Sequence, residues 1–280
     1  MSARARFHGS AAEGRFSARF TKAPIMEFPQ RTIAQIIDSE REMLLAATQR
    51  YGKYYETALE CSMLMTQFLK SIDPHMFVFG GFLSLAKKHH TLAVFSALRL
   101  HKVQAMMNLR QTLEAGACAA FAIANPDPAH FVVADEHDIL DPVPAGKRYA
   151  WLDQNYPEGS TALKEIKTQI NSTVAHANLI STHNTFRPDY ESGWFSAPFF
   201  DIEDEHHVKT DLWMIGNAAL TLMHYFYQIN ENRNVIKFID NFWPLIQTLG
   251  QTNNALRAEM MSTDRFKQVM AKEAARKKSG

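Results

Sequence analysis

The stretch LRQTLEAGACAAFAIAN, residues 109–125, decides the fold class of this chain. Arg110 and Glu114 are four residues apart, which places them on one face of a helix, and the small residues that follow let another helix pack closely. Downstream, NSTVAH places Asn171 and His176 on a second predicted helix. If the two helices pack together, four polar side chains meet in an apolar interior, where unpaired polar groups are costly.

Helical periodicity also dominates the rest of the chain, and strand-like alternation is nearly absent. We expect helices at residues 32–72, 76–124, 145–155, 158–185, 204–230 and 235–261. Gly52, Gly80-Gly81 and Trp243-Pro244 are predicted sites of a bend or break, while Ser160 and Asp204 are predicted N-caps. These signals predict an all-α fold, an antiparallel bundle of about five long helices.

An irregular segment interrupts this pattern at residues 187–202. It contains Pro188, Gly193 and Pro198, as a loop does, but it also carries five aromatic side chains. Such an aromatic-rich insertion is typical of a loop that folds over the body of a protein or over a pocket. We therefore expect Trp194 to cover the candidate site.

Charge divides the chain into three parts, although the whole carries a net charge of only +1. Residues 1–22 carry +4 and residues 265–280 carry +5, which leaves −8 for the remainder. We predict a flexible basic N-terminal tail at 1–28, a single helical domain at 29–262 and a basic C-terminal helix or tail at 263–280. Basic tails are compatible with a nucleic-acid partner, although solvated chain ends explain them more simply.

Several functional classes are disfavoured by what the sequence lacks. It has no GxGxxG, Walker-type or GxSxG motif and no zinc-type Cys/His spacing, which disfavours common dinucleotide enzymes, P-loop ATPases and serine hydrolases. Residues 201–207, DIEDEHH, resemble a metal cluster in composition, but acidic residues also favour a helix start. We expect no metal, no cofactor and no membrane span; two cysteines without a disulfide framework indicate the cytoplasm.

The polar residues of the two helices allow a structural and a functional interpretation. A half-buried Arg110–Glu114 ion pair organises a bundle interior without any chemistry, and a helical histidine is usually a packing residue. His176 and His183 are seven residues apart, too far to bind one metal as an i, i+4 pair does. The functional alternative is a shared binding or catalytic site.

The motifs LRQTLE (109–114) and NSTVAH (171–176), together with the helical plan, resemble the HEPN superfamily of helical bundles, in its uncharacterised bacterial branch. Active members of that superfamily are metal-independent ribonucleases, commonly dimeric, in which an Arg precedes a His by four to six residues. The resemblance implies that His176 transfers protons and that a homodimer forms. This chain has Asn171 where the Arg would stand, and Asn lacks a cationic fork for phosphate.

Three hypotheses follow. The first is a non-catalytic or degenerate HEPN-like protein that binds a protein partner, a nucleotide or RNA through Arg110, Glu114, Asn171, His176 and Trp194. The alternative is a metal-independent ribonuclease, with His176 as the acid–base group and Arg110 as the phosphate clamp. The third is a structural interaction subunit in which the polar residues fix helix register.

Overall fold

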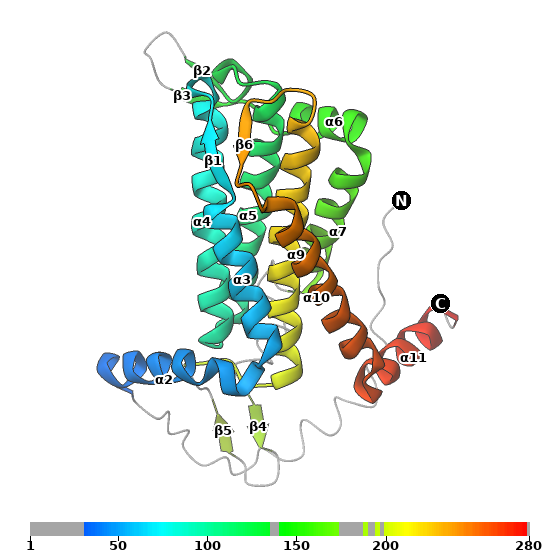
Figure 1. The fold of residues 1–280 in the computed structure, drawn as a ribbon. Coiled ribbons are helices and arrows are strands. Elements are labelled where there is room, and N and C mark those ends of the chain that lie inside the picture. The colour runs from blue at the N-terminus through cyan, green and yellow to red at the C-terminus, as the bar shows by residue number, and fades with distance from the viewer. Residues whose placement is uncertain (1–30, 135–139, 174–186, 190–193, 197–198, 279–280) are drawn as a thin grey trace.

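The computed structural model describes residues 31–134, 140–173, 187–189, 194–196 and 199–278. Within these residues the chain forms nine α-helices and three two-stranded antiparallel sheets (Figure 1). The all-α prediction is confirmed. The helices are α2 (Ile33–Tyr51), α3 (Lys53–Gln67), α4 (Phe77–Leu98), α5 (Lys102–Ala124), α6 (Gly146–Asn155), α7 (Pro157–Thr173), α9 (Glu205–Asn230), α10 (Phe242–Ser262) and α11 (Asp264–Lys278).

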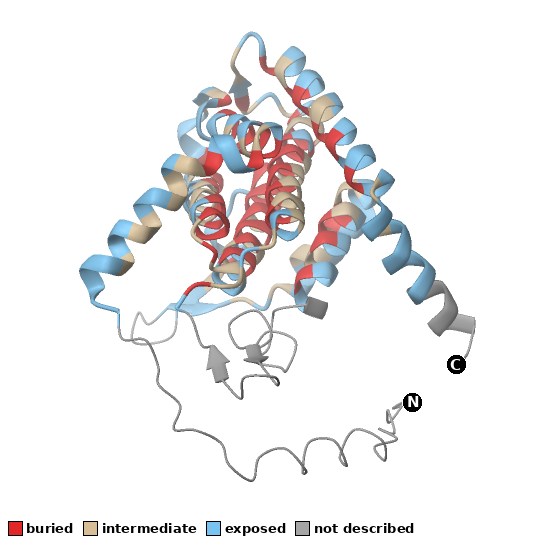
Figure 2. Ribbon diagram, turned by 90° about the horizontal axis from the view of Figure 1, so that it is seen from below, coloured by how far each residue is buried: buried red, intermediate tan, exposed pale blue. Residues whose placement is uncertain are grey.

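Helix α9 is the centre of the bundle, and α3, α4, α5, α7 and α10 pack around it (Figure 1). Most of its buried residues are apolar and are spread along the whole helix, which is why it is covered on several sides. Buried residues concentrate in these inner helices, whereas α2 and α11 are mostly exposed (Figure 2). The fully buried α9 side chains include Leu212, Ile215, Leu222, Met223, Phe226 and Ile229.

Helices α4 and α5 form an antiparallel hairpin, and the break between them corrects the sequence prediction. The break was expected at Gly80-Gly81, but both glycines lie inside α4 and the chain turns at residues 99–101. Leu100 adopts a left-handed φ of 57° there, and the His101 amide donates to the Ser96 carbonyl at 2.9 Å. Burial of the Leu100 side chain in the core, where it is 7% exposed, favours this turn.

Gly52 is confirmed as the bend between the first two helices. Its φ of 48° lies in the left-handed region that glycine adopts without a steric penalty, and α2 therefore leaves the bundle at a steep angle to α3 (Figure 1). A capping box at the start of α2 is formed by Thr32 and Gln35.

Two predicted helices are shorter than expected because their ends pair as strands. Residues 69–72, expected in the first helix, form β1 (Leu69–Ile72), which pairs antiparallel with β6 (Ile236–Phe238), expected in the last helix. Helix α10 therefore begins only at Phe242. Pro244 lies in its first turn, where backbone amides have no acceptor within the helix and the missing N–H of proline costs nothing. The bend expected at Trp243-Pro244 is therefore not found.

The predicted helix at 145–155 corresponds to α6, and the helix at 158–185 begins as α7. Ser160 is not the N-cap: α7 starts at Pro157, and the buried Ser160 hydroxyl donates to Asp153 Oδ1 at 2.5 Å. This bond fastens α7 to α6. Residues 174–186, the second half of the predicted helix, lie outside the described residues.

Short strands occupy the remaining connections. β2 (Val132–Ala134) pairs with β3 (Leu140–Pro142) between α5 and α6, and β4 (Arg187–Asp189) pairs with β5 (Trp194–Ser196) within the predicted aromatic-rich segment. The predicted tail at 1–28 lies outside the described residues, whereas α11 begins within the predicted C-terminal segment. None of the helices in the described ranges has the length and apolar character needed to span a membrane.

Candidate functional site

Arg110 and Glu114 lie on the outward side of α5, and Arg110 Nε donates to Glu114 Oε1 at 3.1 Å. The opposite side of the same helix is closely packed. Gly116 faces Leu222 of α9 so closely that a Cβ at this position would overlap the leucine side chain. The small residues therefore bury one side of α5 against α9 and leave the ion pair half-buried, at 30% and 32% exposure.

Lys167 of α7 completes this ion pair from the neighbouring helix. Its Nζ lies 2.9 Å from Glu114 Oε1, so one carboxylate serves two cations. The predicted meeting of the two helices thus takes place, but through a residue that sequence reasoning did not select. Lys167 precedes Asn171 by four residues, so the two side chains lie on one face of α7.

The charges fix the state of the carboxyl group. Partial burial of Glu114 would raise its pKa, but the hydrogen bonds and charges of Lys167 and Arg110 outweigh burial and hold the pKa below its usual value. Glu114 is therefore ionised at neutral pH and suits neither a general acid nor a general base. With two cations and one anion, the cluster carries a formal charge of +1.

Aromatic and apolar side chains form the surroundings of the cluster. The Lys167 ammonium lies 5.3 Å from the centre of the Tyr149 ring of α6. Both residues line a small cavity of about 20 Å³, together with apolar and polar side chains of α5, α6 and α7. A cavity of this size holds about one water molecule. A ligand at this cluster therefore binds on the surface and not in a deep pocket.

Cys118 lies one turn beyond Glu114 on α5 and is half-buried. Burial is the main influence on this thiol and raises its pKa, although the nearby Arg148 opposes the change. A protonated thiol is a poor nucleophile. The described part of the site thus offers cations and hydrogen-bond donors and no activated nucleophile.

The other predicted site residues have different outcomes. Asn171 is exposed on the last described turn of α7, one turn beyond Lys167. His176 lies outside the described residues, as does His183. Trp194 begins β5, but its side chain also lies outside what the structure describes. Their part in the site stays a prediction.

The acidic segment at 201–207 forms the start of α9, as predicted. Asp204 is the N-cap, and its carboxylate accepts from the backbone amides of His206 and His207. Hydrogen bonds from Arg265 are the main reason that the pKa of Asp204 falls to about 2. Within the described ranges, no group of three or more His, Cys, Asp or Glu side chains is arranged to hold a metal ion.

Comparison with known proteins was made for protein-family models, curated proteins and solved structures. None of the three comparisons gives a match to this chain. The HEPN-like character stays a prediction from the motifs at 109–114 and 171–176.

Proposed function

We propose that this protein is a non-catalytic or degenerate HEPN-like helical protein that binds RNA, with Arg110 and Lys167 contacting phosphate groups. The observation that carries the proposal is the sharing of Glu114 by two cations from different helices. Each cation uses only part of its donor capacity in these bonds. A phosphate oxygen approaching from solvent would accept from the donors that remain.

The choice of nucleic acid over a free nucleotide depends on the shape of the site. A buried nucleotide needs a pocket of about 300 Å³ or more. The cavity beside Lys167 is about 20 Å³, so the cluster presents a surface and not a pocket. A polyanion that lies along a surface suits this shape, because its phosphates need only exposed donors.

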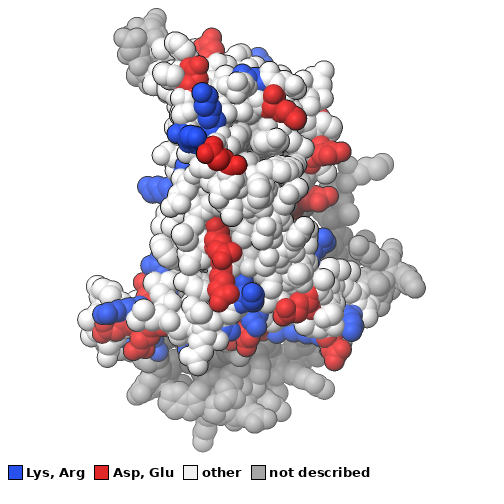
Figure 3. All heavy atoms as spheres, viewed as in Figure 1, with Lys and Arg blue, Asp and Glu red and all other residues white. Residues whose placement is uncertain are grey.

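The face of the molecule seen in Figure 3 offers no competing attraction for a polyanion. Acidic and basic side chains of the described residues alternate along its upper and lower parts, and a largely uncharged area separates them (Figure 3). A mixture of both signs attracts a polyanion weakly. The charges on this face therefore give no second site to prefer over the α5–α7 cluster.

Binding of a fluorescent single-stranded RNA, measured by anisotropy over a salt series, tests this proposal. The double variant Arg110→Ala/Lys167→Ala should weaken binding about tenfold and lower the salt slope by about 2, because two phosphate contacts are lost. The matched control is Arg50→Ala/Lys70→Ala, which also removes one arginine and one lysine, from exposed ion pairs on α2 and β1. Equal losses in both variants, or no binding by the wild type, would contradict the proposal.

The same samples distinguish binding from the ribonuclease alternative. Under the binding proposal, RNA incubated with the protein in EDTA stays intact. Cleavage by the wild type that is lost in His176→Ala would replace the binding proposal with metal-independent hydrolysis.

The proposed assembly is a homodimer, and the exposed apolar side chains of α2 support it.

A further inference from the structure

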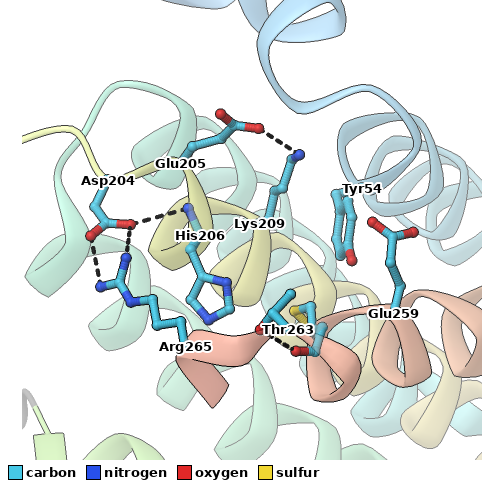
Figure 4. Close-up of a pocket in the computed structure, with 9 residues that line it drawn as sticks. Tyr54, Asp204, Glu205, His206, Lys209, Glu259, Thr263 and Arg265 are labelled. Atoms are coloured by element: carbon cyan, nitrogen blue, oxygen red, sulfur yellow. Dashed lines mark hydrogen bonds and ion pairs between the residues drawn. The ribbon is translucent and has the colours of Figure 1, made fainter. Parts of the chain in front are cut away.

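A polar pocket of about 360 Å³ lies where α3, α9, α10 and α11 meet, well separated along the chain from the α5–α7 cluster (Figure 4). Its volume falls in the range of small-molecule sites. The side chains come from the start of α3 and α9, the end of α10 and the start of α11. They are Tyr54, Asp204, Glu205, His206, Lys209, Glu259, Met260, Thr263 and Arg265.

Two ion pairs within the pocket neutralise all of its lysine and arginine charge. Arg265 binds both oxygens of Asp204, with a shortest distance of 2.8 Å, and Lys209 Nζ lies 2.6 Å from Glu205 Oε1. Glu259 is the third carboxylate in the lining, and among the described residues no cation is paired with it. The pocket therefore lacks one positive charge.

Glu259 lies beside the Tyr54 hydroxyl, and the two groups face the same space (Figure 4). Burial, reinforced by the charge of Glu259 and by hydrogen bonding between the phenol and this carboxylate, raises the pKa of Tyr54 to about 12, so the phenol stays protonated. Its proton is donated to the Leu256 carbonyl at 3.0 Å. The phenol oxygen keeps a lone pair, and together with the Glu259 carboxylate it forms a pair of acceptors.

We propose that this pocket binds a small aliphatic amine of the polyamine class, with one ammonium group held by Glu259 and Tyr54. An ammonium group donates three hydrogen bonds and supplies the missing charge. Glu205 lies at the other side of Lys209 and is 63% exposed, which leaves it able to accept from a second ammonium group (Figure 4). A diamine would supply one ammonium group for each of these two carboxylates.

Isothermal titration of the full-length protein with putrescine tests the proposal. Glu259→Gln should weaken binding about tenfold, because a charge-assisted hydrogen bond is lost while the side chain keeps its size. Lys209→Gln should have the opposite effect and tighten binding several-fold, since it removes a competing cation and frees Glu205. Glu231→Gln, on an exposed residue at the far end of α9, is the matched control and should leave the affinity unchanged.

Three outcomes would overturn the amine site. They are undetectable binding of putrescine, an equal loss of affinity in Glu259→Gln and Glu231→Gln, and complete displacement of putrescine by magnesium ions at an equal concentration of positive charge. The last result would mean non-specific screening of carboxylates. Because the RNA proposal depends on Arg110 and Lys167, neither its success nor its failure changes these expected affinities.

Discussion

His90 is a fully buried histidine in α4, and its surroundings hold it in the neutral state. Its Nε2 lies 3.0 Å from the Ile215 carbonyl oxygen and must therefore carry the proton it donates, while Nδ1 lies 3.3 Å from the Ser62 hydroxyl and accepts from it. Burial lowers the pKa of His90 to about 4, although the bond to Ile215 opposes the change. Protonation would place an unpaired charge in the core.

This environment predicts a loss of stability in weak acid. In the unfolded chain the histidine titrates near pH 6.5, whereas in the native state it stays neutral down to about pH 4. The unfolded state therefore binds more protons as the pH falls from 6.5 to 4, and native stability decreases over that window. Between pH 7.5 and 5 the free energy of unfolding should fall by about 2 kcal/mol from this residue alone.

Urea denaturation of the wild type and of His90→Gln at the two pH values measures this contribution. Glutamine also donates to a carbonyl and accepts from a hydroxyl, but it does not titrate. The other titratable groups are the same in both proteins and cancel in the comparison. A pH dependence as steep in His90→Gln as in the wild type would show that His90 is not responsible.

At the scale of elements, two helical glycines have opposite roles. Gly116 allows α5 to approach α9, and a Cβ there would overlap Leu222; Gly81 lies in α4 with no atom within 4 Å of the position of an added Cβ. Gly81→Ala should raise the free energy of unfolding by about 0.5–1 kcal/mol, because alanine loses less backbone entropy in a helix. Gly116→Ala should lower it by about 1–3 kcal/mol through overpacking.

The midpoints of urea or thermal unfolding, measured on both variants in parallel, check this pair of predictions. The substitution is the same in both cases, so helix propensity acts equally on the two proteins. A stabilising effect of Gly116→Ala would mean that Leu222 repacks without cost and that the contact between α5 and α9 is loose.

The helices could be predicted from local signals. The predicted boundaries are wrong where contacts between distant parts of the chain determine the structure. Gly52, Asn125-Pro126 and the Asp204 N-cap are visible in the sequence because their chemistry is local. The turn at Leu100 has no Gly or Pro to announce it. Likewise, residues 69–72 are a strand only because residues 236–238 pair with them.

The same distinction applies to the candidate site. The i, i+4 spacing of Arg110 and Glu114 predicted their ion pair, which the structure contains. Lys167 was missed because its role depends on the rotation of α7 relative to α5, and one sequence contains no signal for that angle. The pocket around Glu259 combines four helices, so no local pattern could have predicted it.

At the scale of the whole molecule, α2 is the element least covered by the bundle. It runs across one end of the other helices, and its N-terminal half projects beyond them (Figure 1). Ala47 and Tyr51 of its C-terminal half are buried, whereas Ile33 and Ile37 are 77% and 58% exposed. Isoleucine side chains exposed on a projecting helix favour association with an apolar surface.

The proposed homodimer predicts that this part of α2 lies in the contact between protomers. Light scattering after size exclusion should give twice the 31.8 kDa mass of the chain for the wild type. Ile33→Glu/Ile37→Glu should give the mass of one chain, because each carboxylate would lose its hydration in an apolar contact. Met63→Glu/Leu85→Glu adds the same charge at exposed apolar positions of α3 and α4 and should leave the dimer intact.

A wild type that elutes as one chain over a dilution series would exclude the dimer, and dissociation by both double variants would place the contact elsewhere. Since the two α2 positions are exposed in the single chain, loss of the dimer should not lower helix content, and circular dichroism separates dissociation from unfolding.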